Sequence, residues 1–262
     1  MAKQQSKRFE ARETRRRGDV QAQPTDYEAR GKVVKPCNEP IRARTDAQAR
    51  YIASIKGKTI TFATGPAGTG KTWLCASLAA DALRDKQIEK IIVTRPAVEA
   101  GESLGFLPGE MEDKFGHYLI PFEEALIERL GTGAYEYHKR MGNIEGAPLA
   151  YMRGRTFKNA LVILDEAQNT TPEQMKMFLT RIGEGSRMVV NGDTGQVDIR
   201  GKSGLQDAVE RVTWIPTIGH VRFERKDVVR HGVIQEILEA YEKGVGIGQI
   251  LSQKPTIVPA AA

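Results

Sequence analysis

The feature that most constrains this chain is a short glycine-rich segment, residues 65–72 (Gly-Pro-Ala-Gly-Thr-Gly-Lys-Thr), which follows the apolar run at residues 59–64. The segment fits the pattern G-x-x-x-x-G-K-[ST] at every fixed position. Glycines let consecutive backbone N–H groups turn inward around an anion, and the helix that follows aims its positive end at the same anion. We therefore expect a strand, a phosphate-binding loop and a helix in direct succession.

The loop residues are the predicted nucleotide-binding set: Gly65, Pro66, Ala67, Gly68, Thr69, Gly70, Lys71 and Thr72. In such loops the lysine reaches the β- and γ-phosphates, and the final hydroxyl holds Mg²⁺. We therefore expect ATP and Mg²⁺ as ligands, with Lys71 catalytic and Thr72 on the metal. The alternative is an ordinary glycine turn before a helix.

A second segment, Asp165-Glu166, ends the apolar run at residues 161–164. We expect Asp165 to hold the metal ion or its water and Glu166 to polarise an attacking water. Small-molecule kinases activate the acceptor through substrate contacts and need no second carboxylate aimed at water, so the pair favours hydrolysis. The alternative is a solvated acidic pair at a strand end.

A third segment, residues 192–198, follows the next apolar run. The neighbouring parallel strand would end near the γ-phosphate, so Gln196 is expected to sense that phosphate or to orient the attacking water. Asn-Gly-Asp is also common turn chemistry, which leaves a simple turn as the alternative.

Apolar and helical patterns alternate along the chain, which predicts an α/β fold with a parallel sheet and helices on its faces. This pattern predicts strands at 59–64, 90–94, 160–164, 187–190 and near 220–223. It also predicts helices between them and a last helix around 233–241. Two capping boxes, at 171–174 and 203–206, are expected to open helices. Residues 39–262 are predicted to form one domain, with an insertion at about 97–158 that carries its own small helices.

The net charge is +6, and its excess lies at the start, where residues 1–17 hold seven Lys or Arg against two Glu. Residues 1–38 are polar and lack periodicity, which predicts a basic flexible arm. The arm is either a clamp on nucleic-acid phosphates or a solvated tail. We expect a cytoplasmic protein with no membrane partner, because no apolar run is long enough to span a bilayer and the N-terminus is not a secretory signal. Cys37 and Cys75 lack metal or disulfide spacing.

Several motifs in order resemble the PhoH family, the phosphate-starvation-inducible P-loop ATPases related to the RecA-like core of superfamily-one helicases. They are residues 65–72, 94–96, 151–155, 165–169, 192–198 and 227–231. The resemblance spans roughly residues 40 to 245. It implies a RecA-like P-loop NTPase core that hydrolyses ATP and acts on single-stranded RNA or another nucleic acid, as an RNA helicase would.

The resemblance also implies roles for further residues. Gln48 resembles the glutamine that recognises adenine, and a solvent-facing helix glutamine is the alternative. Arg230 resembles an arginine that reaches the γ-phosphate from outside the loop, and a helix-capping arginine is the alternative. Arg95, Arg153 and Arg155 are expected either to line a nucleic-acid track or to form ion pairs within the fold.

The chain is long enough for only one such core, so Arg230 must act on its own site or on a neighbour's. A closed ring, such as a hexamer with ATP sites shared between subunits, would let Arg230 act on a neighbour's site. Phe106, Leu107 and Phe122 are expected either to supply apolar subunit contacts or to be buried. Two other functions stay open: an ATP-dependent assembly switch without strand movement, and a small-molecule phosphotransferase.

Overall fold

The computed structural model describes residues 33–96 and 118–229. The chain divides into two units, residues 1–34 and 35–262, and the description below concerns the second unit. Several predicted features lie outside the described residues: Arg230, Phe106, Leu107, the helix near 233–241 and most of the basic arm.

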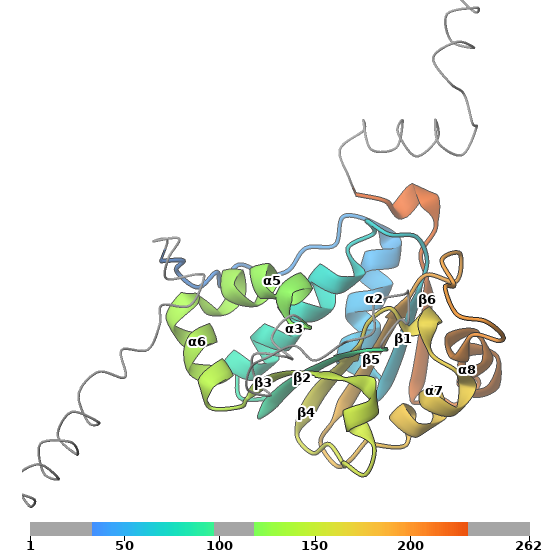
Figure 1. The fold of residues 1–262 in the computed structure, drawn as a ribbon. Helices are drawn as coiled ribbons and strands as arrows, with labels where there is room; N and C mark the ends of the chain where they lie inside the picture. Colours follow the sequence, from blue (N-terminus) through green and yellow to red (C-terminus); the bar gives the residue numbers. More distant parts are fainter. Residues whose placement is uncertain (1–32, 97–117, 230–262) are drawn as a thin grey trace, which may run out of the picture. The chain divides into compact units, whose positions relative to one another are not determined.

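Six parallel strands form one sheet at the centre of the domain (Figure 1). The strand order across the sheet is β3-β2-β4-β5-β1-β6. In chain order the strands are β1 (Ile60–Thr64), β2 (Lys90–Arg95), β3 (Ile144–Pro148), β4 (Ala160–Leu164), β5 (Arg187–Gly192) and β6 (Ile218–Arg222). This sheet confirms the predicted RecA-like α/β fold class, and it places β5 between β1 and β4.

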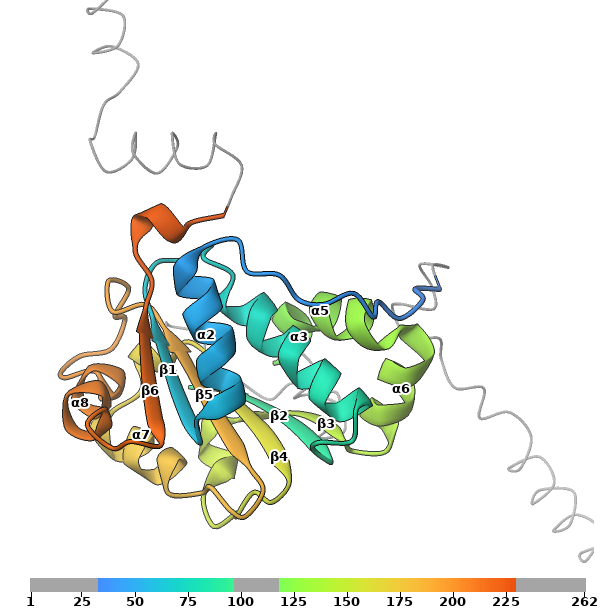
Figure 2. The same cartoon turned by 180° about the vertical axis from the view of Figure 1, so that it is seen from behind.

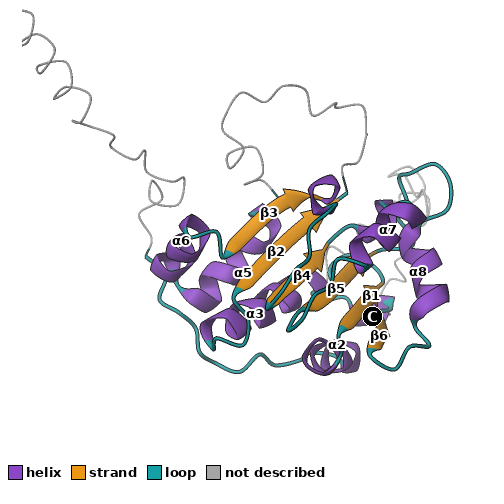
Figure 3. Cartoon of the chain, turned by 90° about the horizontal axis from the view of Figure 1, so that it is seen from below, coloured by secondary structure: helices purple, strands orange, loops and turns teal. Residues whose placement is uncertain are grey.

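Helices cover both faces of the sheet (Figures 2 and 3). One face carries α2 (Asp46–Gly57), α3 (Lys71–Arg84), α5 (Ile120–Leu130) and α6 (Thr132–Arg140). The other carries α7 (Pro172–Leu179) and α8 (Gly204–Val212), with the short 3₁₀ turns η1 (Leu149–Met152) and η2 (Ala167–Asn169). A third such turn, η3 (Arg225–Asp227), follows β6. Among the described residues, no helix is long and apolar enough to cross a membrane.

Two of the three strands that lead into the predicted site segments are buried along their full length. Every residue of β1 and of β4 is buried, as expected for strands that carry helices on both faces. Burial on both faces explains why these strands read in the sequence as continuous apolar runs. It also makes their ends rigid platforms for the loops that follow.

The predicted insertion contains the expected small helices but also a strand. Helix α5 begins at Ile120, beside the predicted start at Pro121, and Phe122 is fully buried, so Phe122 is not a subunit contact. Strand β3 was not predicted. It pairs with β2 at the sheet edge, with Ile144 opposite Ile91. Its Gly146 and Pro148 weaken the strand pattern, and an edge position tolerates both residues.

One of the two predicted capping boxes forms. At the start of α7 the Thr171 side chain accepts from the Gln174 backbone N–H, and Gln174 in turn accepts from the Thr171 N–H. The second predicted capping box, at Ser203, does not form. Ser203 precedes α8 without a side-chain cap, and its Oγ is directed to the Gln168 carbonyl, to which it donates at 2.8 Å.

Candidate functional site

The glycine-rich segment forms a tight loop between β1 and α3. Gly65, Gly68 and Gly70 have φ values of 139°, 83° and 84°, which side chains disfavour. A Cβ at Gly65 would also lie 2.3 Å from the Phe223 carbonyl oxygen. Glycine is therefore required at Gly65 both for its dihedral angles and for its close packing against the end of β6.

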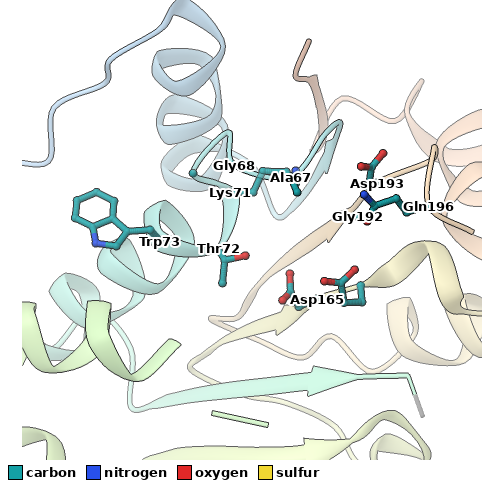
Figure 4. A pocket seen from close by; sticks show the side chains of 11 residues that line it. Ala67, Gly68, Lys71, Thr72, Trp73, Asp165, Gly192, Asp193 and Gln196 are labelled. Atoms are coloured by element: carbon teal, nitrogen blue, oxygen red, sulfur yellow. The ribbon is translucent and has the colours of Figure 1, made fainter. Parts of the chain in front are cut away.

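The loop lines a cavity of about 310 Å³ together with residues from two other strand ends (Figure 4). Asp165 and Glu166 follow β4, and Asp193 and Gln196 follow β5. From the loop side the lining includes Lys71, Thr72 and Trp73. The structure thus brings together the three segments that were singled out in the sequence, because the ends of parallel strands meet at one edge of the sheet.

The Lys71 ammonium lies over the loop itself. Its Nζ donates to the carbonyl oxygens of Gly65 at 2.7 Å and Pro66 at 2.8 Å, and to Thr69 Oγ1 at 3.3 Å. Burial raises the pKa of Asp165, and the positive charge of Lys71 is one of the groups that oppose this rise. The predicted phosphate-binding cation is therefore held at the mouth of the loop and is electrostatically coupled to the acidic segment.

Asp165 is buried and forms an ion pair with Arg95. Burial raises the pKa of Asp165, and the Arg95 guanidinium opposes that rise. Glu166, in contrast, is exposed and adopts a left-handed backbone conformation with φ of 52°. That conformation is costly for a residue with a side chain, and here it accompanies a carboxylate on the cavity wall.

Gln168 connects the acidic segment to the loop after β5, a role that was not predicted. Its Nε2 donates to Glu166 Oε2 at 2.7 Å, and its Oε1 accepts from the Asp193 backbone N–H at 3.0 Å. Gln168 is almost fully buried. The signal available in the sequence was its place two residues after Glu166, in the motif that resembles the PhoH family.

Asn169 makes a second connection to the same loop. Its Nδ2 donates to Asp198 Oδ2 at 3.1 Å, and its Oδ1 accepts from the Asp198 backbone N–H at 2.9 Å. Within the loop, the Gly195 N–H donates to Asp193 Oδ1 at 2.9 Å, which closes a tight turn before Gln196. The loop that carries Gln196 is thus attached at both ends to the segment after β4.

A buried polar chain lies beneath the phosphate loop. Tyr51 donates to Asn191 Oδ1 at 2.6 Å, and Asn191 Nδ2 lies 3.3 Å from the Cys75 sulfur. Burial raises the pKa of Cys75 to about 12, so the thiol stays protonated. Cys75 is a core residue, and this chain of polar contacts ties α2 and α3 to the end of β5.

Gln48 is buried on α2 against the loop, so the solvent-facing alternative is excluded. Its Nε2 donates to the Thr69 carbonyl at 2.9 Å, and its Oε1 accepts from the Arg44 N–H at 2.7 Å. Both ends of the amide are therefore engaged within the chain. The predicted contact with adenine would replace one of these bonds.

The three arginines predicted for a nucleic-acid track differ in their surroundings. Arg95 pairs with Asp165, and Arg155 pairs through both terminal nitrogens with Glu145, at 2.8 Å for the NH2 contact. These two follow the ion-pair alternative. Arg153 is exposed and remains available to a ligand.

The donor set fits a magnesium ion. Thr72 and Asp165 both line the cavity, and a hydroxyl with a carboxylate supplies the hard oxygen ligands that Mg²⁺ takes alongside phosphate oxygens and water. Within the described residues, no cluster of three His, Cys, Asp or Glu suits a metal held by protein alone. A cation at this site would therefore be shared with a phosphate ligand.

Known proteins resemble this chain over most of its length. The family model described as PhoH-like protein matches residues 40–242. The PhoH-like protein of Bacillus subtilis (strain 168) is 53% identical over 205 residues, which cover 78% of this chain and 64% of that protein. Protein PhoH of Escherichia coli (strain K12) is 52% identical over 206 residues, which cover 77% and 58%. The crystal structure of Pif1 helicase from Candida albicans matches with a TM-score of 0.42 and 16% identity, over 85% of this chain and 50% of that one.

The chain spans about three fifths of the length of the curated relatives it matches. The matched stretch includes the glycine-rich loop, the acidic pair and the loop that carries Gln196. With a family model matched over more than half of its residues and relatives above 50% identity, the chain belongs to the PhoH-like protein family.

Proposed function

We propose that this chain is a Mg²⁺-dependent ATPase whose hydrolysis is coupled to the binding or remodelling of single-stranded RNA or another single-stranded nucleic acid. The observation that carries the proposal is the cavity in which the phosphate loop, the acidic pair and Gln196 meet. A phosphate loop alone would support binding only. The exposed carboxylate of Glu166 on the same cavity supports hydrolysis.

In this proposal the phosphate loop and the residues that support it bind the nucleotide. Backbone N–H groups of residues 67–70 and the start of α3 are suited to the β-phosphate. Lys71 exchanges its carbonyl partners for β- and γ-phosphate oxygens, which are stronger acceptors because they are charged. Gln48 supports the loop through Thr69 and is the candidate for adenine recognition.

Hydrolysis requires a positioned water and a group that takes its proton. The water oxygen bonds to the γ-phosphorus while the bond from that phosphorus to the β,γ-bridging oxygen breaks, and ADP leaves with the bonding electrons. Glu166 accepts the proton from the water, and Gln196 orients that water. A bound Mg²⁺ would be held by Thr72 and through Asp165, and it would neutralise charge on the phosphates.

Contact with nucleic acid is assigned to positive groups that the fold leaves accessible. Arg153 is exposed, whereas Arg95 and Arg155 are already paired with carboxylates. The basic residues at 1–17 add charge without base recognition. Arg230 is assigned to the ATP site of a neighbouring subunit, in a homo-oligomeric ring closed by repeating one heterologous contact.

Phosphate release measured with single-stranded RNA, with single-stranded DNA and without polymer tests the proposal. We expect Mg²⁺-dependent release of inorganic phosphate that rises when one polymer is added, and its near-complete loss in Lys71→Ala. Turnover unaffected by polymer but tied to a change in oligomer size would favour an assembly switch. A phosphorylated product other than inorganic phosphate would identify a phosphotransferase instead.

A further inference from the structure

Different residues line the two ends of the nucleotide cavity. In Figure 4, Asp193 and Gln196 lie at one end, the loop residues Ala67, Gly68 and Lys71 lie in the middle, and Trp73 projects at the opposite end. In the proposed function the γ-phosphate faces the Glu166 and Gln196 end. The rest of the nucleotide, which is attached at the other end of the phosphate chain, must then extend toward Trp73.

Trp73 presents a large aromatic surface at this end. It is the third residue of α3, directly after Thr72, and 40% of its surface is exposed although it lines the cavity. Tryptophan buries more area than most side chains when a ligand covers it. Ligand cavities commonly combine such aromatic faces with a few fixed polar groups.

The indole ring is oriented by its own polar atom. Its Nε1 donates to Glu128 Oε2 of α5 at 3.2 Å, and α3 and α5 pack closely against each other. A hydrogen bond at the ring edge limits rotation of the side chain and leaves the faces of the ring for stacking. This hydrogen bond to α5 gives the Trp73 ring a preferred orientation.

The other candidate for base contact is less accessible. Gln48 is only 4% exposed, and both ends of its amide are bonded within the chain. A base can meet the exposed ring of Trp73 without breaking any hydrogen bond of the protein. Stacking on an aromatic ring requires no particular base edge, because every base has a π-face.

We propose that Trp73 forms the base-binding subsite of the nucleotide site and that the purine of ATP stacks on its indole ring. This inference rests on the proposed function and names the contact that holds the base. It predicts that base affinity and phosphate affinity are separable. Variants of Trp73 change the binding of a nucleotide but not the binding of an inorganic polyphosphate.

Two substitutions of similar size test the proposal. Trp73→Phe keeps an aromatic face, whereas Trp73→Leu keeps apolar bulk without one. We expect the Kd of Mg·ATP to change less than about threefold in Trp73→Phe and to rise about tenfold or more in Trp73→Leu, the range found for base–aromatic stacking. The Kd of inorganic tripolyphosphate should stay the same in the wild type and both variants. Circular dichroism and sizing establish that each variant is folded and of unchanged oligomeric size.

A fluorescence measurement provides an independent readout. The chain has two tryptophans, and Trp214 is 78% exposed on the residues after α8, so Trp214→Phe leaves Trp73 as the sole emitter. We expect ATP to quench the remaining emission and tripolyphosphate to leave it nearly unchanged. Equal responses to both ligands would show that the loop moves and that the ring does not stack.

The outcomes separate this inference from the proposed function. Wild-type binding of neither ATP nor tripolyphosphate would overturn both. Normal ATP binding by a folded Trp73→Leu protein would overturn the base subsite alone. Equal losses of ATP and tripolyphosphate affinity would also overturn it, since Trp73 would then support the loop. A changed oligomeric size with unchanged ATP affinity would place Trp73 at a subunit contact instead.

Discussion

Gln168 shows how a single buried amide can fix two parts of a reaction site. Its donor end holds the Glu166 carboxylate and its acceptor end holds the Asp193 backbone. A side-chain amide offers a donor and an acceptor on two separate atoms, so it can hold two different groups at once. Glu166 and the loop of Gln196 are therefore kept in one relative position by one residue.

Replacing Gln168 should accordingly affect chemistry more than binding. In Gln168→Leu we expect kcat to fall by about 10²-fold with little change in KM, because misplacement by about 1 Å costs that much in other sites. Stability should fall by about 1–3 kcal/mol as the Asp193 N–H loses its partner. Steady-state kinetics and thermal unfolding measure the two effects, and Gln206→Leu, at an exposed site on α8, is the control. Equal loss of ATP binding would contradict a positioning role.

Glu166 is the residue whose removal should separate binding from hydrolysis. Glu166→Gln is nearly isosteric but cannot accept a proton from water, so we expect single-turnover hydrolysis to slow by about 10²–10⁴-fold with ATP affinity nearly unchanged. Nucleotide affinity and single-turnover rates should be measured on the same preparation. Hydrolysis that persists at saturating ATP would show that Glu166 has no role as the base.

The starts of α7 and α8 show that the same capping-box pattern can predict a cap correctly at one helix and incorrectly at another. Both 171–174 and 203–206 contain the capping-box pattern, and only the first forms both bonds. The Ser203 hydroxyl is directed instead to the Gln168 carbonyl, which lies 35 positions away along the chain. The local pattern contains no information about that partner.

Removal of the two hydroxyls should therefore have different effects, one on stability and the other on turnover. Thr171→Ala should lower the free energy of unfolding by about 1 kcal/mol through loss of the cap and leave turnover unchanged. Ser203→Ala should alter turnover, because its hydroxyl supports Gln168. Urea unfolding and phosphate release on both variants measure this contrast. Identical behaviour of the two variants would contradict it.

Packing between α3 and α5 depends on a buried ion pair. Arg129 is only 3% exposed; it donates to both carboxylate oxygens of Asp81, at 2.9 and 2.7 Å, and to the Glu39 carbonyl at 2.7 Å. It thus joins two helices and the segment before α2. Asp81 also pairs with Arg84, whose side chain is 30% exposed.

The same carboxylate therefore provides a matched comparison. Arg129→Met should destabilise the fold by about 3 kcal/mol, since it removes one partner of a buried pair. Arg84→Met removes a more exposed partner and should cost less than about 1 kcal/mol. The difference in urea midpoint at constant m-value tests the prediction. Equal costs would mean that burial does not determine the strength of this pair.

Strand and loop predictions succeeded where the signal is local. The two fully buried strands β1 and β4 read as apolar runs, and the glycines of the phosphate loop are dictated by backbone geometry. Strand β3 and the Gln168 bridge depend instead on partners that are distant in sequence, β2 for the first and Asp193 for the second. The pairing of Arg95 with Asp165 has the same origin. Such partners become visible only when the sheet is assembled.

For the full chain, the open question is whether one ATP site is completed by two subunits. The described residues supply a phosphate loop, a metal-binding pair and a candidate base on one cavity. They do not include Arg230, the arginine assigned to the γ-phosphate. Val229, the last described residue, donates its N–H to the Gly68 carbonyl at 2.9 Å and so lies against the phosphate loop of its own subunit. Arg230 is the next residue in the sequence, and the two arrangements to compare are action in its own cavity and action across a contact with a neighbour.

Mixing two inactive variants distinguishes these arrangements. Arg230→Ala should lower turnover by about 10³-fold or more with ATP affinity nearly intact, because an arginine finger acts on the transition state. If it acts across a subunit contact, co-expression with Lys71→Ala should restore part of the activity, since some contacts then pair an intact loop with an intact arginine. An arginine that acts within its own subunit predicts no recovery, because each chain carries one defect in its own site. Sizing must first show that mixed oligomers form. Mixed oligomers without recovered activity, or a fully active monomer, would rule out the shared site.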